Sequence, residues 1–101
     1  MAKPEVQYHF EWDAAKAASN RRKHGISFEL AATVFRDPLM LSMFDDEHSE
    51  QEERWVTLGK AANQVLVVVV HTWRDEAANA VRIRLISARP ATAAERQQYE
   101  G

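Results

Sequence analysis

The sequence predicts an α+β domain in which two N-terminal helices precede an antiparallel sheet of three or four strands and a short helix ends the chain. Helix-forming residues with capping signals fill residues 13–36, whereas β-branched runs dominate residues 54–88. The segments between the predicted strands are short, and short connections favour antiparallel neighbours because parallel strands need long crossovers. Helices that precede a run of strands are typical of domains with helices packed on one face of an antiparallel sheet.

The length and composition predict a single globular domain over residues 1–101. The 101 residues are 46% hydrophobic and 28% charged, which is ordinary for one domain. The chain has no cysteine, and this excludes a disulfide framework, a thiolate zinc site and a cysteine nucleophile. The longest apolar run, Val65–Val70, is far shorter than the ~20 residues of a membrane span, and residues 1–10 lack an apolar signal core. We therefore expect a cytoplasmic protein without a membrane segment.

The two N-terminal helices are predicted from their ends. Asp13 is a good N-cap for a helix over Ala14–His24, and Gly25 is the expected left-handed stop. Ser27 caps a second helix, whose apolar stripe continues to Phe35. Asp37-Pro38 ends this helix, because proline has no amide hydrogen and restricts the residue before it.

The rest of the chain predicts strands and one more helix. Residues 39–44 form an apolar hexapeptide, which is either a first strand or a connection between helix and sheet. Strands are predicted over residues 54–60, 65–73 and 81–88. The second of these is apolar on both faces at residues 65–70, which predicts a central strand covered on both sides. The segment Thr92-Ala93-Ala94-Glu95 fits a capping box that starts the C-terminal helix.

Alternation within the last predicted strand gives the most informative local pattern. If Ile83 and Leu85 face the helices, Arg82 and Arg84 stand on the opposite, open face, with Cα atoms about 6.6 Å apart. Two guanidinium groups at this spacing suit a phosphate. The alternative is a solvated face on which the arginines pair with cross-strand acids.

Two other residues have two interpretations each. His71, at the end of a predicted strand, is either a general acid or base near the arginines or a hydrogen-bonded structural histidine. Tyr99, on the C-terminal helix, either packs against the sheet as a lid or reaches into a site with its phenol. The spacing does not separate these alternatives.

Charge is unevenly distributed along the chain. The net charge of −2 argues mildly against a general nucleic-acid binder. However, a basic stretch lies between Asp13 and Glu29, and residues 77–94 contain three arginines and no acid. Residues 45–53 are strongly acidic and predict an exposed loop. This loop includes His48 but has no glycine to turn it tightly, so we do not expect a metal site there.

Several ordered blocks of the sequence form one pattern that spans about Phe10 to Tyr99. The blocks are Phe10-Glu11-Trp12-Asp13, Lys16, Asn20, Lys23-His24-Gly25, Ser27-Phe28, Asp37-Pro38, Glu53-Arg54-Trp55, Arg84 to Ala91, Glu95-Arg96 and Tyr99. Together these blocks resemble one known family, the BrnT toxins.

This resemblance implies a RelE-like fold and a ribonuclease that stops translation as the toxin of a type II toxin–antitoxin system. It also implies a BrnA-type ribbon-helix-helix antitoxin as partner. In a two-plus-two complex, the antitoxin binds operator DNA and the complex represses its own operon. The toxin itself contacts RNA, and it reaches DNA only through the antitoxin.

The implied chemistry is attack of an RNA 2′-hydroxyl on its own phosphorus, which needs a base, an acid and cations for the phosphorane. No cofactor or metal is expected, because arginines supply the positive charge. Arg84 and Arg89 are expected to bind and stabilise the phosphate, with support from Arg54 and Arg82. The candidates for proton transfer are His71, Lys23, His24 and Tyr99. Lys16 and His24 are expected to assist RNA binding.

Two features conflict with this assignment. Arg84 and Arg89 are five residues apart, so strict alternation places them on opposite faces unless the strand bends before Pro90. The acidic loop over residues 45–53 repels RNA, so we expect it to lie away from the cleft or to serve the antitoxin. A non-catalytic binding module that acts only in a DNA-binding complex is the alternative function. A metal-dependent enzyme is a remote third.

Overall fold

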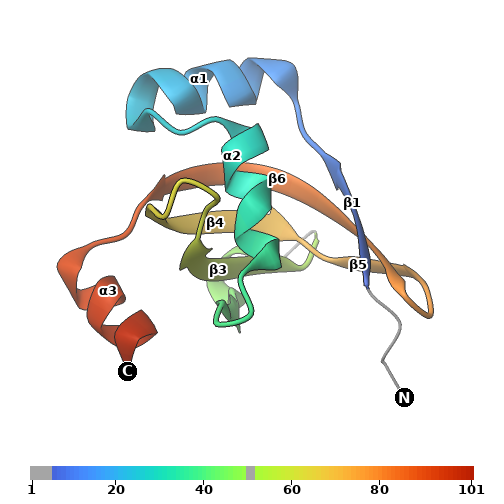
Figure 1. Ribbon diagram of the computed structural model, residues 1–101. Coiled ribbons are helices and arrows are strands. Elements are labelled where there is room, and N and C mark those ends of the chain that lie inside the picture. Colours follow the sequence, from blue (N-terminus) through green and yellow to red (C-terminus); the bar gives the residue numbers. More distant parts are fainter. Residues whose placement is uncertain (1–5, 50–51) are drawn as a thin grey trace.

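The computed structural model describes residues 6–49 and 52–101, in which three α-helices and two short 3₁₀ helices accompany six strands (Figure 1). The elements in chain order are β1 (Gln7–Glu11), α1 (Ala14–His24), α2 (Phe28–Ala32), η1 (Thr33–Arg36), β2 (Leu41–Phe44), η2 (Asp46–His48), β3 (Arg54–Lys60), β4 (Leu66–Thr72), β5 (Arg74–Ala77), β6 (Ala80–Pro90) and α3 (Ala93–Glu100).

The helix ends follow the predicted capping signals. The Asp13 carboxylate accepts a hydrogen bond from the Lys16 amide at 3.0 Å, and Gly25 adopts φ 73° directly after α1. The predicted capping box between Thr92 and Glu95 begins α3. The second helix is shorter than predicted. It is α-helical only over Phe28–Ala32 and then tightens into η1.

The mixed α+β class is confirmed, but the predicted sheet of three or four antiparallel strands is wrong in two respects. The sheet has six strands in the order β1-β6-β4-β3-β2, with β5 paired to β6, and β1 runs parallel to β6. β1 was missed because its partner lies about 70 residues further along the chain, so no short turn reveals the pairing. β5 was missed because it extends the line of β4 after a break at Trp73. Residues 39–44 do contain a strand, β2.

One irregularity in β6 decides which side chains share a face. Val70 pairs with Ser87 and His71 pairs with Leu85, so Ile86 has no partner on β4. Such a bulge inserts one residue and reverses the alternation beyond it. Arg89 pairs with Val68, and Arg84 lies level with Thr72, four residues further along β4. Arg84 and Arg89 therefore lie on the same face of the sheet despite their odd spacing.

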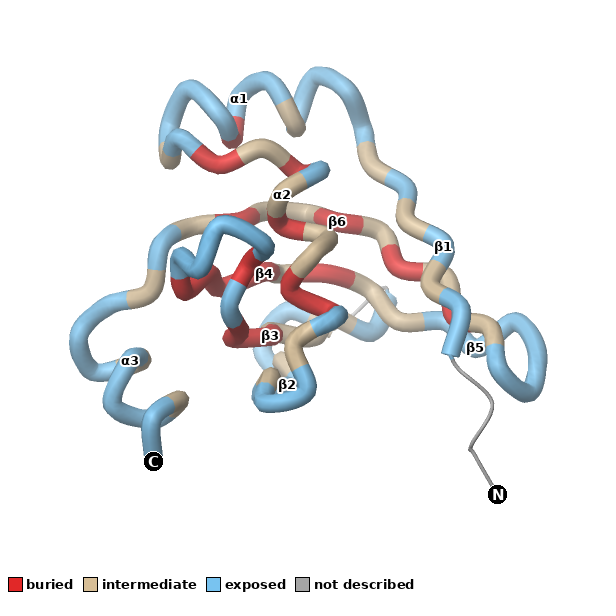
Figure 2. The backbone as a smooth tube through the Cα atoms, viewed as in Figure 1, coloured by how far each residue is buried: buried red, intermediate tan, exposed pale blue. Residues whose placement is uncertain are grey.

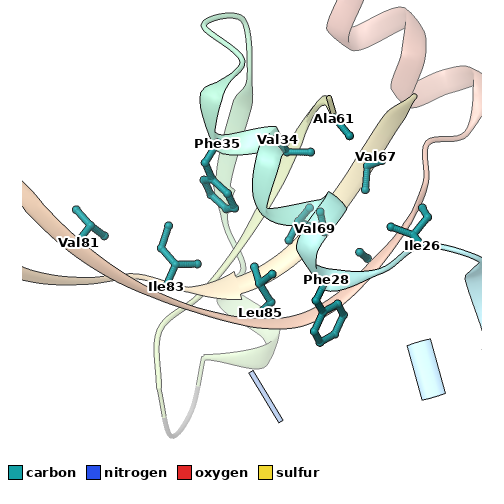
Figure 3. Packing of buried hydrophobic residues seen from close by; sticks show 12 residues of the cluster. Ile26, Phe28, Val34, Phe35, Ala61, Val67, Val69, Val81, Ile83 and Leu85 are labelled. Atoms are coloured by element: carbon teal, nitrogen blue, oxygen red, sulfur yellow. The ribbon is translucent and has the colours of Figure 1, made fainter. Parts of the chain in front are cut away.

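The main hydrophobic core lies between this sheet and the helices α2 and η1, on what we call the helix-covered face (Figure 3). Phe28 and Val34 are fully buried against β4 and β6. The backbone approach is close, because a Cβ on Gly59 of β3 would lie 2.8 Å from a Val34 methyl. β4 is buried along most of its length, as predicted (Figure 2).

The opposite side of the sheet, which we call the second face, is only partly covered. A smaller cluster of Leu58, Leu66 and Val68 packs there against Tyr99 of α3. α3 lies beyond the C-terminal end of β6, at the opposite end of the sheet from the β5–β6 hairpin (Figure 1). The remainder of the second face carries the arginines of β3, β5 and β6.

A side-chain amide attaches α1 to the sheet. Asn20 is buried; its amide nitrogen donates to the Ala88 carbonyl at 2.9 Å and its oxygen accepts from the Ala88 amide at 3.0 Å. Asn20 thus takes the backbone hydrogen bonds of Ala88, in the part of β6 that lies beyond its pairing with β1. In the described part of the chain, no helix is long and apolar enough to cross a membrane.

Candidate functional site

Four strands align one row of polar side chains across the second face. Arg54 of β3 pairs with Thr72 of β4, and Arg84 of β6 pairs with Glu11 of β1. The Arg84 amide donates to Thr72 Oγ1 at 3.1 Å, which joins the two halves of the row. Because neighbouring strands lie about 4.8 Å apart, the Cα atoms of Arg54 and Arg84 are separated by about 10 Å.

A cavity of about 370 Å³ opens beside this row. Arg82 is two residues from Arg84 and therefore on the same face, and Arg74 of β5 pairs with Arg82. Three guanidinium groups and three carboxylates thus meet at one place. The lining residues are Glu11, Glu52, Glu53, Thr72, Trp73, Arg74, Arg82 and Arg84.

Carboxylates of the chain already contact the arginines that were expected to bind phosphate. Arg82 pairs with Glu76 at 3.0 Å and with Glu11 at 3.2 Å, and these hydrogen bonds, that of Glu76 first, raise its pKa. Arg84 donates to Glu52. Arg82 and Arg84 therefore share one face, as expected. They also pair with acids, as expected from the alternative interpretation of a solvated face. These pairs are half-exposed, and exposed ion pairs contribute little to stability, so an anionic ligand can displace them.

The acidic loop does not lie away from this cavity. Glu52 and Glu53 both line it, so the first of the two expectations for the loop, that it lies away from the cleft, is wrong. The second, that the loop serves the antitoxin, stays a prediction. The strand register explains why Glu52 and Glu53 lie at the cavity. β3 begins at Arg54 in the polar row, so the two residues directly before Arg54 lie beside this row. Residues 50 and 51 of this loop lie outside the described residues.

Arg54 differs from the other arginines of the second face. It lies in the polar row without lining the cavity, and no carboxylate pairs with it among the described residues. Its Nε is buried and has no hydrogen-bond partner in the same part of the chain. Arg54 therefore lies near the cavity with an unsatisfied Nε that is shielded from solvent.

Arg89 shares the face but lies at the other end of it. Its pairing with Val68 places it four residues of β4, about 13 Å, from the polar row. Its guanidinium donates to both carboxylate oxygens of Glu95, at 2.7 and 2.8 Å. This pair raises the pKa of Arg89 and lowers the pKa of Glu95 to about 2. Arg89 attaches α3 to β6 and is not part of the cavity.

His71 lies on the helix-covered face, behind the arginines. It is fully buried, with its ring 4.8 Å from that of Phe35. Nδ1 lies 2.8 Å from the Thr72 carbonyl, which can only accept, so Nδ1 donates and Nε2 accepts from Thr57 Oγ1 at 2.6 Å. Burial lowers the pKa of His71 to about 4. This is the arrangement of the structural histidine, and it separates His71 from Arg84.

Tyr99 adopts the lid arrangement and does not reach into the cavity. Its hydroxyl donates to Asp37 Oδ2 at 2.6 Å, which raises the pKa of Tyr99 to about 12. Burial acts to raise the pKa of Asp37, but hydrogen bonds from the Lys60 amide, Tyr99 and the Leu39 amide outweigh it, so this pKa is lowered. Tyr99 thus attaches the end of α3 to the residues that follow η1.

The basic residues of α1 are also separate from the cavity. Lys16, Lys23 and His24 belong to the helix that Asn20 fastens to β6, and none of them lines the cavity. Lys23 and His24 occupy the last turn of α1, where a helix favours cations. Among the described residues, no three histidine, aspartate or glutamate side chains are grouped to hold a metal ion.

Sequence reasoning missed the acids of the site. Glu11 belongs to β1, whose alternating pattern of Tyr8 and Phe10 inside and His9 and Glu11 outside was the available signal. Glu52 and Glu53 lie in a segment without hydrophobic periodicity, so the sequence pattern could not place them. Thr72 and Arg74 were missed because they flank the break between β4 and β5.

Comparison with known proteins supplies the identification. A family described as "Ribonuclease toxin, BrnT, of type II toxin-antitoxin system" matches residues 12–95, most of the chain. The chain belongs to the BrnT toxin family. Membership in this type II toxin family implies an antitoxin partner. No curated protein sequence matches the chain.

A solved structure is similar in fold. The 1.1 Å crystal structure of the Brucella abortus ribonuclease toxin BrnT matches with a TM-score of 0.50 and 17% sequence identity, and the match covers 86% of this chain and 99% of that chain. At this identity the likeness concerns the fold. The mixed α+β architecture of the BrnT family is therefore confirmed, with more strands than the sequence predicted.

Proposed function

We propose that this BrnT-family chain is an endoribonuclease that cleaves RNA at the cavity of the second face and thereby inhibits translation. The observation that carries the proposal is the gathering of Arg74, Arg82 and Arg84 around one cavity on the uncovered side of a small sheet. Guanidinium groups suit phosphate, because they donate several hydrogen bonds in one plane. Arg54, in the same polar row, adds a further positive charge near the cavity.

In this proposal the 2′-hydroxyl of the bound nucleotide attacks the adjacent phosphorus. The phosphate displaces Glu52 from Arg84, and the arginines stabilise the additional negative charge of the phosphorane. The P–O5′ bond breaks, a 2′,3′-cyclic phosphate forms, and the 5′-oxygen takes a proton from solvent. Since arginines supply the positive charge, the step proceeds without a metal ion.

We propose a carboxylate of the cavity as the proton acceptor, in place of the four candidates that the sequence offered, His71, Lys23, His24 and Tyr99. His71 is buried on the other face and Tyr99 is bonded to Asp37, so neither reaches a ligand in the cavity. The acids that line the cavity are Glu11, Glu52 and Glu53. Glu11 lies opposite Arg84 in the strand register and shares Arg82 with Glu76, and we assign it as the base.

The proposal for the partner and the location is supported by membership in the family. We infer a ribbon-helix-helix antitoxin of the BrnA type, a two-plus-two complex that binds operator DNA through the antitoxin and represses its own operon, and a cytoplasmic location. In that complex, acidic side chains of the antitoxin compete with RNA for the arginines of the cavity.

The second candidate function is a toxin-fold module without catalysis, which acts only in the regulatory complex. The ion pairs on Arg82 and Arg84 favour it, because they occupy the groups that would bind phosphate. Expression of the chain alone in bacteria separates the two functions. Growth arrest with RNA cleavage supports the nuclease, whereas harmless accumulation of folded protein supports the module. Cleavage by the purified chain in EDTA tests the metal-free mechanism.

A further inference from the structure

An unusually apolar surface lies on β2. Of the six large hydrophobic side chains that are exposed among the described residues, four fall between residues 39 and 44, and two of these, Leu41 and Met43, share the second face. Met43 is 65% exposed and Leu41 is 45% exposed. Contiguous exposed apolar surface marks interaction sites on small proteins. β2 is also the last strand in the described sheet order, so one of its edges carries no partner strand there.

The second face forms a groove at this surface. Leu41 pairs with Leu58 and Met43 pairs with Val56, so these four side chains share the second face. With Val68 they line a cavity of about 270 Å³, whose other wall is formed by Glu95 and Gln98 of α3. The pairs of α3 with the rest of the chain, Arg89–Glu95 and Tyr99–Asp37, hold this wall in place.

The groove is continuous with the arginine end of the same face. Along β3, Leu58 and Val56 lead directly to Arg54, four residues or about 13 Å from one end to the other. The second face therefore has an apolar half that ends at α3 and a cationic half around Arg54, Arg82 and Arg84. A ligand that matches both halves carries apolar side chains followed by carboxylates.

We infer that the second face is the docking surface for a segment of the antitoxin with apolar side chains in the groove and acidic side chains at the arginines. The type II family implies such a partner, and charge complementarity selects the acidic half of the segment. The apolar half supplies most of the affinity, because buried apolar anchors dominate protein interfaces. The same segment also covers the cavity of the arginines and so would block RNA cleavage. Only this inhibitory consequence rests on the proposed function, and binding of the segment does not.

The decisive variant is Met43→Glu, which places a charge in the groove without touching the cavity. The matched control is Val65→Glu, because Val65 is 42% exposed in the turn before β4 and lies outside the groove. The probe is the ribbon-helix-helix protein encoded beside this gene, titrated against each purified chain by calorimetry. Circular dichroism and thermal melting check that both variants fold.

We expect Met43→Glu to bind the antitoxin roughly 10- to 100-fold more weakly, with Val65→Glu unchanged. In cells, Met43→Glu arrests growth in the presence of antitoxin amounts that neutralise the unaltered chain. Equal affinity of the unaltered and Met43→Glu chains overturns the inference, as does failure of the unaltered chain to bind. The inference also falls if the chain alone forms dimers in sedimentation that Met43→Glu dissociates, because the groove is then a contact between copies. Binding is measured without RNA, so an inactive chain with a Met43-dependent complex refutes only the nuclease proposal.

Discussion

Arg89 donates two hydrogen bonds to Glu95, and this pair joins the end of β6 to the first turn of α3. The pair connects the sheet to the helix that walls the groove and lies about 13 Å from the polar row. Arg89 therefore holds α3 against β6, whereas Arg82 and Arg84 line the cavity. The variants of these arginines have different expected effects.

Replacement of Arg84 by alanine is expected to lower RNA cleavage by roughly a hundredfold or more, because a preorganised donor to the phosphorane is lost. Arg82→Ala has a similar effect. The matched control is Arg96→Ala, since Arg96 is an exposed arginine of α3 that pairs with Glu100 at 3.7 Å and does not line the cavity. Single-turnover cleavage of a labelled RNA measures the effect. Full activity of both cavity variants would remove these arginines from the site.

Arg89→Ala and Glu95→Gln are expected to weaken the attachment of α3 by similar amounts, about 1 kcal/mol or less in the free energy of unfolding, because Arg89 is partly exposed. The lowered pKa of Glu95, about 2, makes this contribution complete above about pH 4.5 and removes it as the pH falls towards 2. Denaturant unfolding of the unaltered chain and Glu95→Gln between pH 2 and 6 measures the difference. A difference that does not shrink with falling pH contradicts the assignment.

Glu52→Gln is expected to increase RNA affinity by up to about fivefold, since it frees Arg84 from a half-exposed ion pair. Glu47→Gln removes the same charge from η2, outside the cavity, and controls for the change in net charge. Fluorescence anisotropy with a short, non-cleavable RNA measures both variants at several salt concentrations. Equal gains by Glu52→Gln and Glu47→Gln would indicate a general charge effect instead of competition at Arg84.

His71 is expected to remain neutral with its proton on Nδ1 throughout pH 5–8. Burial lowers its pKa to about 4, below the ordinary value of 6.5, so the folded state loses stability as the pH falls from 6.5 to 4. Nitrogen chemical shifts of the imidazole in NMR spectra report both the tautomer and the titration. A His71 resonance that titrates near pH 6.5 would place the ring in contact with solvent and return it to the list of possible bases.

Tyr99→Phe is expected to preserve RNA cleavage while lowering the free energy of unfolding by about 1 kcal/mol, because the bond to Asp37 is lost but the ring still packs on the second face. The phenol transition near pH 12 disappears from the ultraviolet titration. Loss of cleavage in a stably folded Tyr99→Phe protein would restore the phenol to the chemistry.

The sequence predicted local structure well and long-range pairing poorly. Capping signals at Asp13, Ser27 and Thr92 defined where helices begin, because a cap is a contact between near neighbours. β1 escaped prediction because its partner strand is distant in sequence. The site shows the same division. Alternation placed Arg82 and Arg84 on one face, but only the register across β1, β4 and β6 revealed Glu11 and the bulge at Ile86.

The amide of Asn20 has a consequence for solubility. Unprotected strand edges recruit strands from other molecules, which is a common beginning of aggregation. In the second half of β6, the Asn20 side chain takes both backbone hydrogen bonds of Ala88, which a foreign strand would otherwise seek. One carboxamide thus protects this part of the longest strand, where no additional strand pairs with it. An apolar residue in place of Asn20 would leave the Ala88 amide and carbonyl without these hydrogen bonds and free to pair with a strand of another molecule.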